Sequence, residues 1–174
     1  MTEYRRRIDI VLDPSYVEDL QSIDLAELRS RKKVADEVET ELSYYRRLLH
    51  GRLDILAFEL RRRAGEETRS LIEALPDVLG AGETTQGGPT RFPTVFAPDL
   101  PDTHRRHIDH VLGDDFLSRL PVIDDDELGD IRESLKEAEI DISSSRKAVQ
   151  KVVDALRVEL VRRYKDDAAG LTIL

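Results

Sequence analysis

The chain has 174 residues, 40% of them hydrophobic and 36% charged, a balance that excludes a thick globular core and fits long helices with a narrow apolar seam. It contains no cysteine, which excludes a disulfide framework and a thiolate metal site, and its net charge of −9 disfavours direct binding to DNA while suiting a partner with a basic face. No signal segment and no run of ~18 apolar residues is present, so we expect a cytoplasmic protein that does not enter the membrane.

The first predicted elements are short. Residues 5–12 form a short segment of polar and apolar side chains, and the triplet Asp13-Pro14-Ser15 indicates a turn. Apolar residues at helical spacing then predict a short amphipathic helix through Tyr16, Val17, Leu20 and Ile23. Asp24 is followed three residues later by Glu27, a pattern typical of a helix N-cap.

A long helix is predicted over about 25–64, where no proline interrupts the chain. At ~1.5 Å per residue, about forty residues would make a helix roughly 60 Å long. Its apolar seam is formed by Leu28, Ala35, Val38, Leu42, Tyr45, Leu49 and Leu56. The segment 65–102 follows: residues 66–75 extend the helical pattern, and residues 80–101, rich in Gly, Pro and Thr, indicate a partly flexible linker.

The second half of the chain repeats the first at an offset of one hundred residues. Between 5–63 and 105–163, twenty-one of fifty-nine aligned pairs are identical. The repeats are therefore assigned to 5–64 and 105–165, with a short helix through Phe116, Leu117, Leu120 and Ile123 in the second copy. The pair Asp124 and Glu127 repeats the cap, so a second long helix is predicted over about 125–165.

The second long helix has a nearly strict heptad seam, interrupted by Ser145. Its members are Leu128, Ile131, Leu135, Ala138, Ile142, Val149, Val152 and Leu156. Apolar spacing close to 3.5 on two helices of one chain predicts that these helices pair as a coiled coil. The length of the linker does not decide between parallel and antiparallel pairing.

A polar stripe recurs beside both seams, in the order Glu, Ser, Arg, Gln or His, Asp. The first copy is Glu39, Ser43, Arg46, His50 and Asp54, and the second copy is Glu139, Ser143, Arg146, Gln150 and Asp154. At ~100° per residue, the five side chains of a copy fall within roughly an 80° arc, about a quarter turn from the seam. Duplication of a core preserves apolar residues, whereas this duplication also preserves four of five polar positions.

These polar residues offer the chemistry of guanine recognition. An Arg fork can donate to guanine O6 and N7, and Asp can accept from guanine N1–H and the exocyclic amine. Ser and Gln suit phosphate or sugar oxygens. Two copies related by a pseudo-two-fold axis would match a symmetric dinucleotide. The alternative is that the same side chains form salt bridges within each helix on a solvated face.

At these residues the chain resembles the cyclic-di-GMP-dependent anti-sigma factors of actinobacteria, the RsiG family. The motif Glu-x3-Ser-x2-Arg-x3-Gln-x3-Asp occurs on both predicted helices, and the resemblance covers nearly the whole chain apart from the linker. His50 departs from the motif, because it stands where Gln is expected.

The resemblance implies an all-α fold in which two long helices from an internal duplication form an antiparallel coiled-coil hairpin, with short N-terminal helices in each repeat. It implies two partly intercalated molecules of cyclic di-GMP as the regulatory ligand, held by the ten stripe residues. The implied partner is a WhiG-type sigma factor, sequestered when the nucleotide is bound, with no direct contact to DNA.

Other functions are also compatible with parts of the sequence. A ligand-independent coiled-coil scaffold or protein-interaction module is the main alternative. A metal site at His104, His107, His110 and Asp109 is disfavoured because the repeat does not preserve those histidines. No phosphate loop, nucleophile elbow or catalytic triad order is visible, so we expect no enzyme activity and no metal. The arginine clusters 5–7, 61–63 and 162–163 are interpreted as solvated helix ends without a role.

Overall fold

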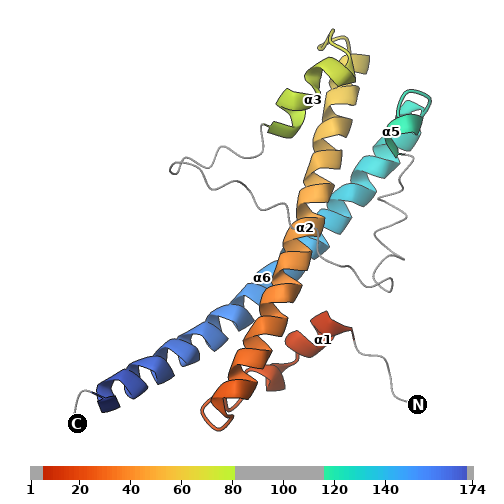
Figure 1. Ribbon diagram of the computed structural model, residues 1–174. Helices are drawn as coiled ribbons and strands as arrows, with labels where there is room; N and C mark the ends of the chain where they lie inside the picture. The colour runs from red at the N-terminus through yellow and green to blue at the C-terminus, as the bar shows by residue number, and fades with distance from the viewer. Residues whose placement is uncertain (1–5, 81–115, 172–174) are drawn as a thin grey trace, which may run out of the picture. The chain divides into compact units, whose positions relative to one another are not determined.

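Two long helices dominate the computed structural model, which describes residues 6–80 and 116–171. They are α2 (Leu25–Arg63) and α6 (Asp125–Leu171), and they pack against each other (Figure 1). The shorter elements are α1 (Arg7–Val11), the 3-10 helix η1 (Pro14–Tyr16), α3 (Leu71–Gly80) and α5 (Phe116–Arg119). The described ranges contain no strand, and the predicted all-α fold class is confirmed.

The chain forms two compact units, each with one half of both long helices. Unit 1 contains Met1–Ser43 and Ser143–Leu174, and unit 2 contains Tyr44–Ile142. In unit 1 the start of α2 lies against the end of α6, as shown by the bond from Arg29 Nη2 to the Tyr164 hydroxyl at 2.8 Å. In unit 2 the end of α2 meets the start of α6, because Arg63 Nη1 donates to Asp125 Oδ1 at 2.6 Å. The helices therefore run antiparallel in each unit.

Both long helices begin where the sequence predicts. The backbone N–H of Glu27 donates to Asp24 Oδ1 at 2.7 Å, and that of Glu127 donates to Asp124 Oδ1 at 2.8 Å. Each aspartate satisfies one of the backbone donors that have no partner in the first helical turn, a contribution of about 1 kcal/mol per cap.

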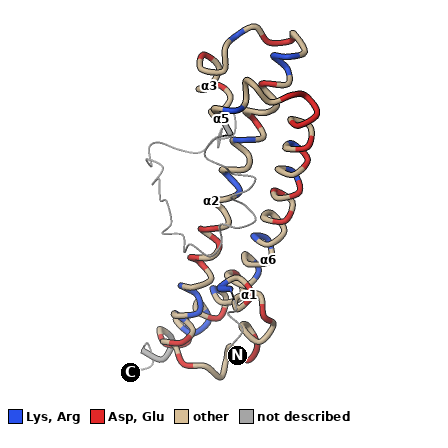
Figure 2. Tube along the Cα trace, turned by 90° about the vertical axis from the view of Figure 1, so that its right-hand side faces the viewer, with Lys and Arg blue, Asp and Glu red and all other residues tan. Residues whose placement is uncertain are grey.

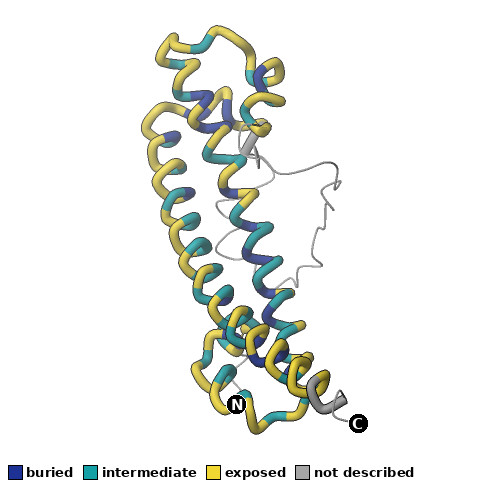
Figure 3. Tube along the Cα trace, turned by 90° about the vertical axis from the view of Figure 1, so that its left-hand side faces the viewer, coloured by how far each residue is buried: buried dark blue, intermediate teal, exposed yellow. Residues whose placement is uncertain are grey.

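The predicted seam is the line along which the helices pack. Every predicted seam residue is buried or half-buried, and the buried positions recur along one side of each helix (Figure 3). In unit 2 the cluster comprises Leu49, Ile55, Leu56, Leu120, Ile123, Leu128 and Leu135. Burial of each such side chain stabilises the fold by roughly 1.5–3 kcal/mol, so this seam is the main source of stability.

The amphipathic helix predicted through Tyr16 and Ile23 is wrong. Helical structure occurs earlier, in α1, and η1 is followed by turns and bends up to residue 23, with Asp19 at a φ of +48°. The side chain of Asp13 accepts from the backbone N–H of Ser15, which favours a turn there. The Tyr16 hydroxyl donates to the carbonyl of Arg31 at 2.9 Å, and Arg31 Nη1 donates back to the Tyr16 carbonyl at 3.0 Å. A turn that is hydrogen bonded to α2 therefore stands where the sequence predicts a short helix.

A separate helix, α3, follows the first long helix. Gly65 has a φ of +75°, and the bonds from Gly65 N to the Arg62 carbonyl and from Glu66 N to the Arg61 carbonyl end α2 in a Schellman motif. Ser70 and Glu73 then form a reciprocal capping box, so the new helix starts at Leu71 rather than continuing the old one. The rest of the predicted linker, 81–102, lies outside the described residues.

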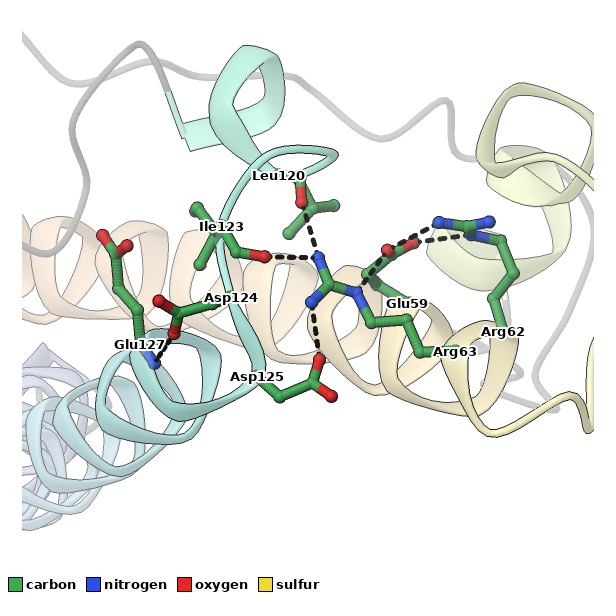
Figure 4. A network of polar contacts seen from close by, with 8 residues as sticks. All are labelled: Glu59, Arg62, Arg63, Leu120, Ile123, Asp124, Asp125 and Glu127. Carbon is green, nitrogen blue, oxygen red and sulfur yellow. Dashed lines mark hydrogen bonds and ion pairs between the residues drawn. The ribbon is translucent and has the colours of Figure 1, made fainter.

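The helix ends carry a duplicated arginine contact, here named the carbonyl clamp and formed by Arg63 in unit 2 and Arg163 in unit 1. Arg63 Nη2 donates to the carbonyls of Leu120 and Ile123 at 3.0 and 2.8 Å (Figure 4). Arg163 Nη2 donates to the carbonyl of Leu20. The interpretation of these arginines as solvated ends is therefore wrong: they hold the segment that precedes the other long helix.

A buried carboxylate holds each clamp in place. Glu59 is 3% exposed and accepts from Arg62 and Arg63, and Glu159 is 7% exposed and accepts from Arg162 and Arg163. The bond from Arg62, opposed by burial, lowers the pKa of Glu59, and those from Arg162 and Arg163 lower the pKa of Glu159 to about 2. Both acids therefore stay charged across the neutral pH range.

Replacing Arg63 by Met should lower the free energy of unfolding by about 2 kcal/mol, since the Leu120 and Ile123 carbonyls lose a charged donor. The matched control is Arg62→Met: Arg62 pairs with the same Glu59 from a more exposed position and should cost less. Urea unfolding followed by circular dichroism measures both. Equal losses for the two variants would contradict the clamp.

The fold should lose stability in acid. The pKa of Glu159 is about 2 in the folded protein, against an ordinary value of 4.5. Its contribution is therefore complete above pH 4.5 and lost as the pH falls from 4.5 towards 2. Urea unfolding between pH 6 and pH 2 should show this loss, and Glu159→Gln should flatten the pH dependence. An unchanged slope in the variant would argue against the assignment.

Candidate functional site

The polar stripe, defined by its five positions in each copy, lies on α2 and α6 beside the seam. Unit 1 contains Glu39 and Ser43 of the first copy with Ser143, Arg146, Gln150 and Asp154 of the second. Unit 2 contains Arg46, His50 and Asp54 of the first copy with Glu139 of the second. Each unit therefore combines stripe positions from both copies.

In unit 1 the stripe residues converge on one carboxylate. Glu39 Oε1 accepts from Ser43 Oγ at 2.9 Å and from Gln150 Nε2 at 3.4 Å, and it forms an ion pair with Arg146 Nε at 3.0 Å. Arg146 Nε also donates to Ser43 Oγ at 2.6 Å. A guanidinium, an amide and a hydroxyl, drawn from both helices, thus surround a single anionic oxygen.

In unit 2 the first-copy histidine meets the second-copy glutamate. His50 Nε2 lies 3.0 Å from Glu139 Oε1. Because an ionised carboxylate can only accept, the Nε2 atom carries the proton and donates. His50 is 49% exposed and Glu139 is 23% exposed, so this pair is open to solvent on the histidine side.

The same contact therefore occurs in both units: the fourth stripe residue of one helix donates to the first stripe residue of the other. Gln150 pairs with Glu39 in unit 1, and His50 pairs with Glu139 in unit 2. Antiparallel pairing of two copies of one motif produces this exchange of partners. Pairing within a helix, the alternative interpretation, accounts for the Ser43–Glu39 bond but not for these contacts between helices.

The stripe lies at the edge of the seam, as its predicted offset of a quarter turn requires. The side chains of Arg146 and Glu39 are 26% and 25% exposed, and Arg46 is half-buried. Asp54 and Asp154, the last positions of each stripe, are exposed. A ligand could therefore reach the polar atoms, while the arginines are shielded enough for their charge to act strongly on it.

Sequence reasoning missed the carbonyl clamp, although its residues carry a signal. The pairs Glu59/Glu159, Arg62/Arg162 and Arg63/Arg163 are identical in the two copies, like the stripe. The sequence alone indicates only solvated helix ends for the arginine clusters, because basic residues suit a helix C-terminus. Arg63 and Arg163 bind backbone carbonyls of turns, and the positions of turns cannot be predicted from helical periodicity.

The residues of the disfavoured metal site, His104, His107, His110 and Asp109, lie outside the described residues. Within the described ranges, no group of three or more His, Asp or Glu side chains is arranged to hold a metal ion. Among the same residues, no helix combines the length and apolar character needed to cross a membrane.

Comparison with known protein families identifies a match over both repeats. A family model described as RsiG-like matches residues 14–79 and 114–173, which together make up more than half of the chain. The matched ranges include both long helices and all ten stripe residues. No curated protein matches the chain.

The Glu39–Arg146 contact should contribute measurably to folding. A double-mutant cycle with Glu39→Gln and Arg146→Met should give a coupling of about 0.5–1 kcal/mol, because both side chains are a quarter exposed and partly screened by water. Urea unfolding of the four proteins measures it. A coupling near zero would mean that the two side chains do not pair in solution.

Proposed function

Because the chain belongs to the RsiG-like family, we propose that it is an anti-sigma factor whose hold on a WhiG-type sigma factor depends on bound cyclic di-GMP. Family membership supplies the general role, that of a regulator acting on a sigma factor, in a family of regulators rather than of enzymes. The nucleotide and the type of sigma factor are the finer parts of the proposal.

The convergence of donors on Glu39 carries the nucleotide part of the proposal. Arg146, Ser43 and Gln150 meet at one anionic oxygen, which is the arrangement that a phosphodiester or a guanine acceptor edge would also satisfy. In the proposed complex the dinucleotide takes up part of these donors, and the exposed Asp54 and Asp154 accept from guanine N1–H and the exocyclic amine.

Electrostatics restricts where such a ligand can bind. Cyclic di-GMP carries two negative charges, and the protein carries a net charge of −9, with acidic residues recurring along α6 (Figure 2). Attraction is confined to places where arginine is partly shielded from water. Arg46 in unit 2 and Arg146 in unit 1 are such places, so each unit offers one arginine of the motif to the ligand.

Linkage explains how the nucleotide would control the sigma factor. Two bound nucleotides would become part of the surface that the sigma factor meets, so its affinity would rise with occupancy of the stripe. By thermodynamic reciprocity, the sigma factor would tighten nucleotide binding by the same factor. The protein would then release its partner when the nucleotide concentration falls.

Arg146→Ala should weaken binding of cyclic di-GMP about 5- to 150-fold, the range expected for loss of a bidentate arginine contact. Lys147→Ala is the matched control, because Lys147 is the adjacent cation, is exposed and is not a stripe residue. Calorimetry measures the affinity, and circular dichroism checks that both variants keep their helices. Equal affinities for the wild type and Arg146→Ala would refute the assignment.

Association with the purified sigma factor, measured with and without cyclic di-GMP, tests the gating step. Strong association should require cyclic di-GMP, and other cyclic dinucleotides at the same concentration should not replace it. Full association in nucleotide-free buffer would instead support the alternative, a ligand-independent interaction module.

A further inference from the structure

We propose that His50 makes one half of the stripe sensitive to pH, so that cyclic di-GMP binds more tightly as the solution becomes acidic. The inference rests on the function proposed above. It concerns the one stripe position at which the two copies differ, since Glu39/Glu139, Ser43/Ser143, Arg46/Arg146 and Asp54/Asp154 are identical pairs and His50/Gln150 is not.

The two differing residues occupy the same place in their units. Gln150 Nε2 donates to Glu39 Oε1 at 3.4 Å in unit 1, and His50 Nε2 donates to Glu139 Oε1 at 3.0 Å in unit 2. The difference between the two halves is therefore one of side-chain chemistry, because the contact and its partner are the same.

The number of N–H donors decides what each side chain can do next. The amide nitrogen of Gln150 has two hydrogens, so it can donate to Glu39 and to a ligand at the same time. A neutral imidazole has one N–H, and in His50 this N–H is already hydrogen bonded to the Glu139 carboxylate. The other ring nitrogen, Nδ1, can then only accept, and it cannot bind a phosphate oxygen.

Protonation removes this restriction. The imidazolium of His50 has a second N–H at Nδ1, so it can donate to Glu139 and to an anionic ligand together, and it adds a positive charge. Histidine is the side chain whose charge ordinarily changes between pH 5 and pH 8. Ligand binding at this half of the stripe should therefore take up a proton, and binding at the Gln150 half should not.

The charged groups around His50 belong to several elements. On α2, Arg46 and Arg47 lie one turn before it and Asp54 lies one turn after it; on α6 it meets Glu139. The acids of α3, which packs on the same unit, are engaged locally: Glu73 accepts from Ser70, and Asp77 accepts from Arg69. Binding of cyclic di-GMP would add negative charge beside these groups, and this charge would favour the protonated form of His50.

The experiment compares the wild type with His50→Gln and Gln150→His. Calorimetry with cyclic di-GMP at several pH values should show wild-type affinity falling about tenfold between pH 5.5 and pH 8, as expected for one added charge near an anion. His50→Gln, which restores the motif, should bind with an affinity that does not vary with pH. Gln150→His should bind with a steeper pH dependence than the wild type.

A second readout counts protons directly. Binding enthalpies measured at pH 7 in buffers of different ionisation enthalpy should reveal proton uptake by the wild type and none by His50→Gln. Equal pH profiles and equal proton uptake in these two proteins would overturn the role of His50 while leaving the proposed function intact. Failure of every variant to bind cyclic di-GMP at any pH, with helices intact by circular dichroism, would overturn both.

Discussion

The register of the apolar seam is the constraint on which the other contacts depend. In each unit the seam positions of α2 and α6 face one another and are removed from water, and the register of this pairing decides which polar residues lie opposite each other. Glu39 meets Gln150 in unit 1 and His50 meets Glu139 in unit 2 only in this register. A slip by one heptad, ~10 Å along a helix, would keep an apolar seam but separate both pairs.

The carbonyl clamp opposes such a slip, because it ties each helix end to a defined point. Arg63 holds the turn before α6 within unit 2, and Arg163 holds the turn before α2 within unit 1. A hydrophobic seam is tolerant of register, since leucines repeat, whereas directed bonds to particular carbonyls are not. The seam therefore supplies most of the stability of the fold, and the carbonyl clamp helps to select one register of the two helices.

Local signals in the sequence predicted much of this structure. Asp24 and Asp124 marked the starts of α2 and α6, and the heptad spacing identified the buried faces. The parts that the sequence did not predict depend on contacts between residues distant in the chain. Tyr16 lies in a turn that is hydrogen bonded to Arg31, fifteen residues away. The repeat reveals the stripe residues. Which of them meet across the two helices depends on whether the helices pair parallel or antiparallel, and the length of the linker does not decide this.

Duplication also explains why a single substitution can change one half of the stripe. When two copies make the same contact between the helices, a change in one copy leaves the contact of the other copy intact. His50 keeps the bond to Glu139, so it is compatible with the fold, and in the proposed pH response a protonated imidazole would offer the ligand a second N–H donor. The imidazole therefore keeps the contact between the two helices, and under the proposed function its main effect would be on what this half of the stripe binds.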